Sequence, residues 1–291
     1  MKLIIAALVL GSMITACSAQ VMKDKDSTDD QSPTSAPIAT QWTLDAAGTV
    51  QRAGIKAVLM LYCPVSGMKG TGFLIDNGLV VTNNHVVAPC SAQQMIGLSS
   101  LGKQVKFRKV ATDVTVDLAL LRPSEQLSGG LHLAAPAENP PVGISVSTWG
   151  YPLNFNGPAP LLSTGYIAGF IEDGAGVKKV KHLVIDGAFN PGNSGGPLFK
   201  ANDDKVIGIV VAKFLPFPPA VEQTIIMMSK VGSGVIYTGT DATGKPTSIS
   251  EAQIVASVLQ EFYKGTQVMI GEAISVAELR AMLVSKEAEL K

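Results

Sequence analysis

The residue types that serine-based acyl transfer requires occur in three short motifs along this chain of 291 residues. One motif is a serine, Ser194, in the glycine-rich run NPGNSGGPL at residues 190–198. Glycines let a backbone approach a substrate carbonyl closely and adopt conformations that other residues avoid. The amides of Gly192 and Ser194 could then point at one spot and stabilise a developing oxyanion. A loop of this kind is by itself most often a turn, so its interpretation depends on the other two motifs.

A histidine and an aspartate precede this serine, in the order His, Asp, Ser. His85 follows the apolar run VVT at residues 80–82, and Asp117 precedes the apolar run LALL at residues 118–121. A serine nucleophile needs a base that accepts its proton and a carboxylate that orients the base. Because a carboxylate beside an apolar strand is costly without a partner, we expect Asp117 to have one. Asp113 would share its face of a regular strand, but the apolar run favours Asp117.

Together these motifs resemble those of trypsin-fold serine proteases of the HtrA/Deg type. The resemblance covers about residues 50 to 240 and rests on four segments: GTGFLI at 70–75, VVTNNHVV at 80–87, DLALL at 117–121 and GNSGGPL at 192–198. It implies an all-β protein of two antiparallel six-stranded β-barrels, chymotrypsin-like, with the active site between them. By the same resemblance Ser194 is the nucleophile, His85 the general base and Asp117 its orienting acid. The amides of Gly192 and Ser194 form the oxyanion hole.

The resemblance also places the pocket for the substrate side chain before the cut. Its base is expected near Ala188, and its walls at Val211, Ala212, Lys213 and Val235. None of these residues is acidic, so a basic substrate residue would be buried without a partner. We therefore expect cleavage after small or medium aliphatic residues such as alanine, valine or leucine. The substrate backbone is expected to pair as an added strand along residues 211–213, which favours extended or unfolded chains.

Two departures from the family pattern affect these expectations. HtrA-type enzymes usually carry PDZ domains after the protease, whereas the short segment after Thr240 has the pattern of helices and no PDZ domain is expected. Asn193 stands where digestive relatives have an aspartate that binds a newly cut N-terminus. Because an amide cannot form that ion pair, activation by N-terminal trimming is not expected.

Short runs of β-branched and aliphatic residues recur through residues 57–237, and Gly, Pro, Asn or Asp separates most of them. Many short strands with such turn residues are typical of an all-β barrel or sandwich. The proline-rich segment 135–141 interrupts the strands near their middle and is expected to connect two β units. We predict a protease domain at residues 42–246, with barrel one at about 50–134 and barrel two at about 142–246.

Two amphipathic helices are expected in a C-terminal helical extension at residues 247–291. Residues 248–251 have the pattern of a capping box and precede apolar residues at helical spacing, with Gly265 as a stop. A second box at residues 275–278 precedes another such run. The favoured interpretation is that both helices pack on the β domain as a cap, and self-association through them is the alternative.

The chain begins with MKLIIAALVLGSMITAC, which is typical of an export signal at residues 1–16. The last four letters, ITAC, resemble a bacterial lipobox. This implies lipidation of Cys17 and, with Ser18 after it, anchoring in the outer membrane on its periplasmic face. Cleavage after Ala19, which would leave a periplasmic or secreted protein, is the alternative. Residues 17–41 are polar and are expected to form a flexible tether.

Composition and cysteine content bear on the remaining partners. Lys and Arg number 23, as do Asp and Glu, so no net charge attracts nucleic acid. The chain shows no metal-ligand spacing and no nucleotide-binding motif, so we expect neither a metal nor a cofactor. Cys63 and Cys90 remain once Cys17 is set aside, and a disulfide between them is expected in an oxidising compartment. Two buried thiols are the alternative.

The sequence thus predicts a serine endopeptidase that acts on protein or peptide substrates. The alternative is a catalytically silent trypsin-fold binding module at the cell envelope. An esterase or acyltransferase with the same triad is disfavoured, because the serine motif is not the Gly-x-Ser-x-Gly elbow of those enzymes. The oligomeric state is not predicted.

Overall fold

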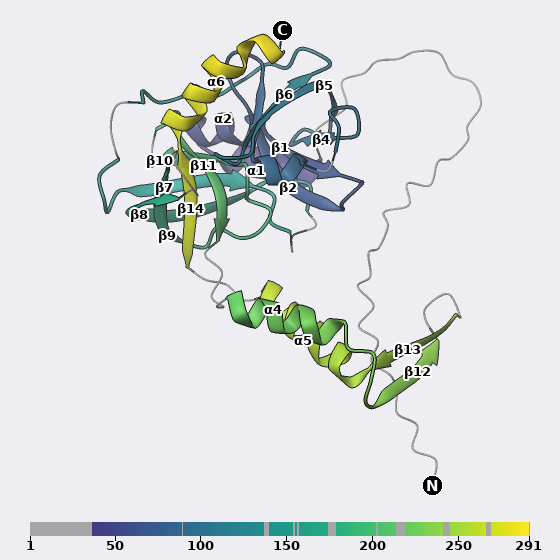
Figure 1. Cartoon of the computed structure of the whole chain (residues 1–291). Coiled ribbons are helices and arrows are strands. Elements are labelled where there is room, and N and C mark those ends of the chain that lie inside the picture. The colour runs from purple at the N-terminus through teal and green to yellow at the C-terminus, as the bar shows by residue number, and fades with distance from the viewer. Residues whose placement is uncertain are drawn as a thin grey trace, which may run out of the picture. The chain divides into compact units, whose positions relative to one another are not determined.

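Two closed β-barrels account for most strands of the computed structural model, which describes residues 37–88, 90–136, 140–153, 155, 157–173, 179–201, 203–213, 219–240, 245–265 and 269–290 (Figure 1). The chain divides into two compact units. Within the described residues, one unit comprises the segments from 37 to 213 and from 269 to 290, and the other comprises the segments from 219 to 265. The expected signal peptide, Cys17 and most of the expected tether lie outside the described residues.

Barrel one is a closed antiparallel barrel with the strand order β1-β2-β3-β6-β5-β4. Its strands are β1 (Val58–Cys63), β2 (Met68–Leu74), β3 (Val80–Thr82), β4 (Ile96–Ser99), β5 (Gln104–Asp113) and β6 (Leu118–Pro123). Along β5, Val105 and Phe107 are buried while the residues between and after them are exposed, as expected for a strand with one face on a core. Cys63, at the end of β1, forms a disulfide with Cys90, and their Cα atoms lie 5.9 Å apart.

Barrel two has the order β10-β11-β14-β9-β8-β7 and is also closed and antiparallel. Its strands are β7 (Ser145–Gly150), β8 (Leu161–Asp173), β9 (Val180–Gly187), β10 (Pro197–Lys200), β11 (Val206–Lys213) and β14 (Ile270–Ser275). Inward side chains from these strands, Val146, Leu183 and Leu198 among them, form its core. The prediction of two six-stranded antiparallel barrels is confirmed.

The last strand of barrel two comes later in the chain than predicted. β14 pairs with β11 on one side and with β9 on the other, so the barrel closes at residues 270–275 and not before residue 246. The segment 217–266, between β11 and β14, is the separate unit. The predicted boundary at residue 246 and the single extension at 247–291 are therefore wrong. β14 reads IGEAIS, and its glycine and glutamate hide it among turn-like residues.

The inserted unit, residues 217–266, consists of two helices and a β-hairpin. Its elements are α4 (Pro219–Ser229), β12 (Ile236–Thr240), β13 (Pro246–Ser250) and α5 (Glu251–Gly265). The capping box of α5 is formed by Ser250 and Gln253, two residues later than predicted. The Ser250 hydroxyl accepts from the Gln253 N–H at 3.2 Å, and the Gln253 side chain accepts from the Ser250 N–H at 2.9 Å.

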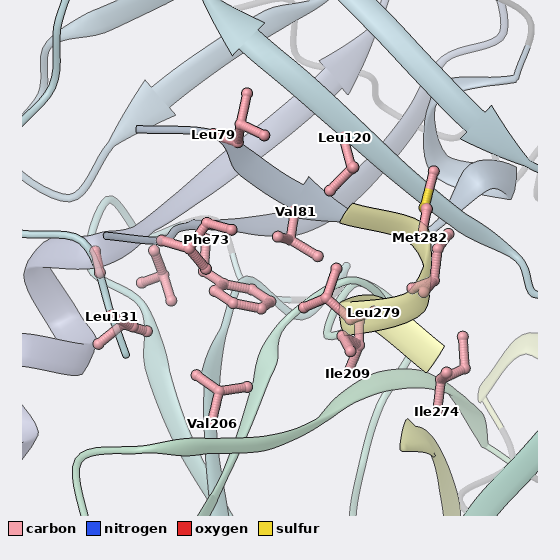
Figure 2. Close-up of a cluster of buried hydrophobic side chains, with 14 of the residues drawn as sticks. Phe73, Leu79, Val81, Leu120, Leu131, Val206, Ile209, Ile274, Leu279 and Met282 are labelled. Carbon is pink, nitrogen blue, oxygen red and sulfur yellow. The ribbon is translucent and has the colours of Figure 1, made fainter. Parts of the chain in front are cut away.

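The helix α6 (Val276–Leu290) follows β14 and packs on the barrels. Figure 2 shows Leu279 and Met282 of α6 beside Ile209 and Ile274 of barrel two and Val81 of barrel one. Leu279 is fully buried, and burial of one such side chain contributes about 1.5–3 kcal/mol. The last helix of the chain thus packs on the β domain as expected.

Two helices precede the first strand, and a third connects two strands of barrel one. They are α1 (Ile38–Ala46), α2 (Thr49–Ala57) and the short α3 (Asn84–Val87) after β3. Leu44 of α1 and Ile55 of α2 belong to the same core cluster as α6. Over the described part of the chain, no helix combines the length and apolar character that a membrane span needs. Those residues also contain no PDZ domain.

Candidate active site

His85 lies in the short helix α3, and both oxygens of one carboxylate hold it. Its Nδ1 atom lies 2.7 Å from Oδ2 of Asp117, and its backbone N–H donates to Oδ1 of Asp117 at 2.9 Å. The two side chains are 40% and 28% exposed. When Nδ1 carries the proton of this contact, Nε2 has a free lone pair that can accept a proton. The arrangement fits a general base with its orienting acid.

Asp117 has an unusual backbone conformation, with φ of 57°. Aspartate tolerates this left-handed region better than most residues do. The Asp117 carbonyl accepts hydrogen bonds from the Asn84 N–H at 3.1 Å and from the Asn83 side-chain amide at 3.0 Å. Asn83–His85 therefore wraps around Asp117, which holds its carboxylate against the imidazole.

The other aspartate considered from the sequence has a different position. Oδ1 of Asp113 accepts from the N–H groups of Thr115 and Val116 at 3.0 and 3.2 Å, which stabilises the turn between β5 and β6. That turn leads the chain into Asp117. The acid that contacts the histidine is thus Asp117.

Ser194 lies in the loop between β9 and β10 of barrel two, between strands of both barrels. Its hydroxyl donates to the Val211 carbonyl of β11 at 2.6 Å, and its carbonyl accepts from the Thr71 N–H of β2 at 2.9 Å. Among the described residues, no hydrogen bond joins the Ser194 hydroxyl to His85. The Ser194 hydroxyl must therefore leave the Val211 carbonyl and turn its proton toward His85 before the histidine can take it.

Gly70 and Gly195 show how closely the two barrels approach beside the nucleophile. A methyl group at Gly70 would lie 2.7 Å from a Val86 methyl carbon and 3.3 Å from the Ser194 carbonyl oxygen. A methyl group at Gly195 would lie 3.1 Å from the Asn83 backbone nitrogen. The segment that carries His85 and the segment that carries Ser194 are thus packed together across glycines.

The expected oxyanion donors belong to a loop whose carbonyls are all bonded elsewhere. The carbonyls of Pro191, Gly192 and Asn193 accept from the Leu153 N–H at 2.8 Å, the Thr71 hydroxyl at 2.6 Å and the Gly196 N–H at 2.9 Å. Gly192 has φ of 96°, and a methyl group there would lie 2.4 Å from the Tyr151 carbonyl oxygen. Only glycine fits this position.

Two buried polar groups close to the loop lack a hydrogen-bond partner among the described residues. Oδ1 of the fully buried Asn193 has none, while the Asn193 amide donates to the Ser163 hydroxyl at 3.3 Å. The hydroxyl of Tyr151 also has none, and burial raises the pKa of Tyr151. Nearby on β2, burial lowers the pKa of Lys69, whose Nζ donates to the Phe155 carbonyl at 3.3 Å.

Four of the five residues expected to form the specificity pocket lie in barrel two. Ala188 is half-buried at the start of the Ser194 loop. Val211 presents its carbonyl to Ser194, and Ala212 and Lys213 pair with β14. The fifth, Val235, is 55% exposed in the inserted unit, just before β12. The strand that was expected to carry Val235 as a wall of barrel two is not part of that barrel, because β12 pairs with β13 in a separate two-stranded sheet.

Gly271 of β14, and not Val235, lies on the barrel strand next to residues 211–213. It pairs with Lys213 of β11 and with Ile185 of β9, and a methyl group on it would lie 3.0 Å from Cβ of Phe189. Phe189 is fully buried, and sequence reasoning missed it together with Gly271. Phe189 could have been considered from the sequence, because it directly follows Ala188, the expected base of the pocket.

Sequence reasoning also missed two positioning contacts, from Thr71 and Asn83. The two other histidines pair with carboxylates away from Ser194: His132 with Asp76 and His182 with Glu272, each at 3.0 Å. Within the described ranges, no group of three or more acidic, histidine or cysteine side chains is placed to bind a metal ion.

Comparisons with known proteins show which family and which relatives the chain is similar to. Residues 70–209 match the trypsin-like peptidase domain family. A "Probable periplasmic serine endoprotease DegP-like" of Rhizobium meliloti is 34% identical over 149 residues, which is 51% of this chain and 28% of the relative. A protein of the same description from Bartonella henselae is 27% identical over 223 residues, 74% of this chain and 40% of the relative. The chain thus spans less than half the length of these relatives.

Solved structures show the same fold. The inactive form of the Rv3671c protease of M. tuberculosis, an alanine variant, has a TM-score of 0.57 at 19% identity and covers 84% of this chain and 93% of its own. An HtrA-type protease AlgW with a bound tripeptide has a TM-score of 0.53 at 20% identity over 82% of this chain and 63% of its own. Residues 70–209 are therefore similar to the trypsin-like peptidase domain, and the chain is similar in sequence to serine endoproteases described as DegP-like.

Proposed function

We propose that this protein is an exported serine endopeptidase with Ser194 as nucleophile, His85 as general base and Asp117 as its orienting acid. The observation that carries the proposal is that the Asp117 carboxylate contacts both the ring and the backbone of His85. Its Oδ2 lies 2.7 Å from Nδ1, and its Oδ1 accepts from the His85 backbone N–H at 2.9 Å. These contacts favour the tautomer with the proton on Nδ1, which leaves Nε2 free to accept the serine proton. The loop that carries Ser194 also carries the N–H groups of Gly192 and Ser194, the two expected oxyanion donors.

In the proposed reaction Ser194 Oγ attacks the carbonyl carbon of the scissile bond while its proton passes to Nε2 of His85. The carbonyl oxygen becomes an oxyanion that the Gly192 and Ser194 N–H groups stabilise. His85 then gives the proton to the leaving nitrogen, the C–N bond breaks and an acyl-enzyme remains. In the second half, His85 takes a proton from a water molecule while the water oxygen attacks the carbonyl carbon of the ester. The bond from that carbon to Ser194 Oγ then breaks, the carboxylic acid product leaves, and His85 returns the proton to Ser194 Oγ.

The hydrogen bond from Ser194 to the Val211 carbonyl couples this chemistry to substrate binding. A substrate strand that pairs along residues 211–213 needs a carbonyl such as that of Val211 to accept its N–H. A substrate N–H at this carbonyl would compete with the Ser194 hydroxyl, which now donates to it at 2.6 Å, and would favour turning of the hydroxyl toward His85. The resting nucleophile is therefore engaged elsewhere until a backbone arrives.

We further propose that the enzyme cuts extended or unfolded segments after small or medium aliphatic residues. Ala188 leaves little polar character at the pocket base, and Phe189 occupies space against Gly271. The nearest acid on β14 is Glu272, which faces away from Phe189 because neighbouring strand residues alternate faces, and it is bonded to His182. A lysine or arginine before the cut would find no counter-charge among these residues.

Export and lipid anchoring at Cys17 complete the proposal. The relatives described as periplasmic support export, and the ITAC segment supports the anchor. Cys17→Ala should move the protein from the outer-membrane fraction to the soluble periplasmic fraction with unchanged specific activity. Wild-type protein found entirely soluble, with an N-terminus at Gln20, would show ordinary signal cleavage instead.

Labelling with a fluorophosphonate, which reacts with activated serines, tests the catalytic assignment. The wild-type protein should be labelled and should degrade fluorescent casein, and Ser194→Ala should do neither. Ser285→Ala, which changes an exposed serine of α6, is the matched control and should behave as wild type. Unchanged casein hydrolysis by Ser194→Ala would refute the nucleophile. A wild-type protein that neither labels nor cleaves would leave a binding module on the same barrels.

A further inference from the structure

The loop around the nucleophile contains three successive peptide units that alternate in what they offer a substrate. The first unit ends in the N–H of Gly192 and the third in the N–H of Ser194, the two expected oxyanion donors. The N–H of the unit between them, at Asn193, donates within the loop to the Asn190 carbonyl at 3.0 Å. The middle unit therefore sets the angle between the two donors.

The orientation of each unit follows from the partner of its carbonyl. No described peptide bond is cis, and in a trans unit the C=O and the N–H point in opposite directions. The Pro191 and Asn193 carbonyls are held by backbone N–H groups, from Leu153 at 2.8 Å and from Gly196 at 2.9 Å. The carbonyl of the middle unit, that of Gly192, is held by a side chain, the Thr71 hydroxyl at 2.6 Å.

Thr71 is well fixed for this role. It is fully buried on β2 of barrel one, its N–H donates to the Ser194 carbonyl at 2.9 Å and its carbonyl accepts from the Thr82 hydroxyl at 2.7 Å. Its own hydroxyl accepts from the Tyr151 N–H at 3.0 Å. Since that oxygen already receives one hydrogen bond, its single proton is directed to the Gly192 carbonyl.

We infer that Thr71 is a positioning residue that orients the oxyanion hole from the opposite barrel. Without its hydroxyl, the Gly192 carbonyl and the Tyr151 N–H would be buried without partners. Gly192 can adopt many backbone conformations, so the middle unit would then be free to turn. The Gly192 and Ser194 amides would no longer converge on one oxygen. The inference rests on the proposed function, because it concerns how the hydrolytic site is held.

The test compares Thr71→Val, which keeps the shape and removes the hydroxyl, with Thr71→Ser, which keeps the hydroxyl. Thr71→Val should lower kcat for a casein-derived peptide by about 10- to 100-fold, since one oxyanion donor is worth more than this. KM should change by less than about 3-fold, because ground-state binding does not use the hole. The rate constant of fluorophosphonate labelling should fall together with kcat, and Thr71→Ser should restore both.

The matched control is Thr40→Val, which removes the hydroxyl of another fully buried threonine. That hydroxyl has no hydrogen-bond partner in the described structure and lies in α1. Thr40→Val should leave kcat, KM and the labelling rate unchanged. If Thr71→Val does not fold, Thr71→Ala replaces it, because the smaller side chain cannot clash. Failure of both to fold would overturn the inference by assigning the hydroxyl to stability.

Three further results would overturn the inference: wild-type kcat in folded Thr71→Val, a rise in KM with kcat unchanged, or a Thr71→Ser enzyme as slow as Thr71→Val. The proposed function fails separately, since it fails when Ser194→Ala hydrolyses casein as fast as the wild-type protein. Wild-type kinetics in Thr71→Val beside an inactive Ser194→Ala would remove only the role of Thr71.

Discussion

Replacement of Asp117 by asparagine isolates the one contact on which the proposed chemistry most depends. The amide oxygen of asparagine can keep the hydrogen bond from the His85 backbone N–H, which now goes to Oδ1 at 2.9 Å. The NH2 group then takes the place of Oδ2, 2.7 Å from Nδ1 of His85. Two donors cannot face each other, so the ring must keep Nδ1 bare and carry its proton on Nε2. The nitrogen that should accept the serine proton is thereby blocked.

The expected loss is about 10³- to 10⁴-fold in kcat, as for the same change in other triads, which corresponds to about 4–5.5 kcal/mol of activation free energy. The fold should survive, because asparagine tolerates the backbone φ of 57° as aspartate does. The hydrogen bonds from Asn83 and Asn84 are made to the backbone carbonyl and are unaffected. Lost activity with unchanged thermal unfolding is therefore the expected combination.

Steady-state hydrolysis of a casein-derived peptide at neutral pH measures this loss, with circular dichroism as the check on folding. Asp113→Asn is the control, since it makes the same acid-to-amide change at a residue whose Oδ1 accepts from the N–H groups of Thr115 and Val116. It should keep activity within about 3-fold of wild type. A folded Asp117→Asn enzyme with more than about a tenth of wild-type kcat/KM would refute the role of Asp117.

Four other variants test the fold and the loop. Gly192→Ala should abolish casein hydrolysis and lower the melting temperature, because φ of 96° and a contact of 2.4 Å to the Tyr151 carbonyl leave no room for a methyl group. Tyr151→Phe removes a buried hydroxyl without a partner among the described residues, so chemical denaturation should show equal or greater stability, by up to about 1 kcal/mol. Leu279→Ala in α6 should cost about 2–5 kcal/mol in urea unfolding, and a smaller loss would contradict the shared core. Cys63→Ser with Cys90→Ser should cost about 3.5 kcal/mol in the same assay, given a separation of 27 residues.

The three proposed catalytic residues could be picked out from the sequence because the signals for them lie in their immediate neighbours. His85 follows a buried strand, Asp117 precedes one and Ser194 is set among glycines, so residue type and neighbours together mark each of them. Contacts between segments that are distant in the sequence have no such local signal. Thr71 is 121 residues from Gly192, and nothing beside either residue announces the hydrogen bond that joins them.

The misplaced end of barrel two has a physical reason of the same kind. β11 and β14 are antiparallel neighbours, so their connected ends lie close together and any chain that starts and finishes there can join them. The cost of closing such a connection grows slowly, by about 0.6 kcal/mol for each doubling of its length. An insertion such as 217–266 is therefore tolerated, and the hairpin within it is rich in the β-branched and aromatic residues that are typical of strands.

What distinguishes β14 is its register and not its composition. Ile270, Gly271 and Glu272 pair with Asp186, Ile185 and Val184 of β9, and on the other side of the strand Gly271 pairs with Lys213 of β11. The glycine that weakens its strand propensity is the residue that leaves space for Phe189. The features that hid this strand from sequence reasoning are thus the features that place it beside the proposed substrate pocket, and a side chain larger than hydrogen at Gly271 should disturb Phe189 before it disturbs the barrel.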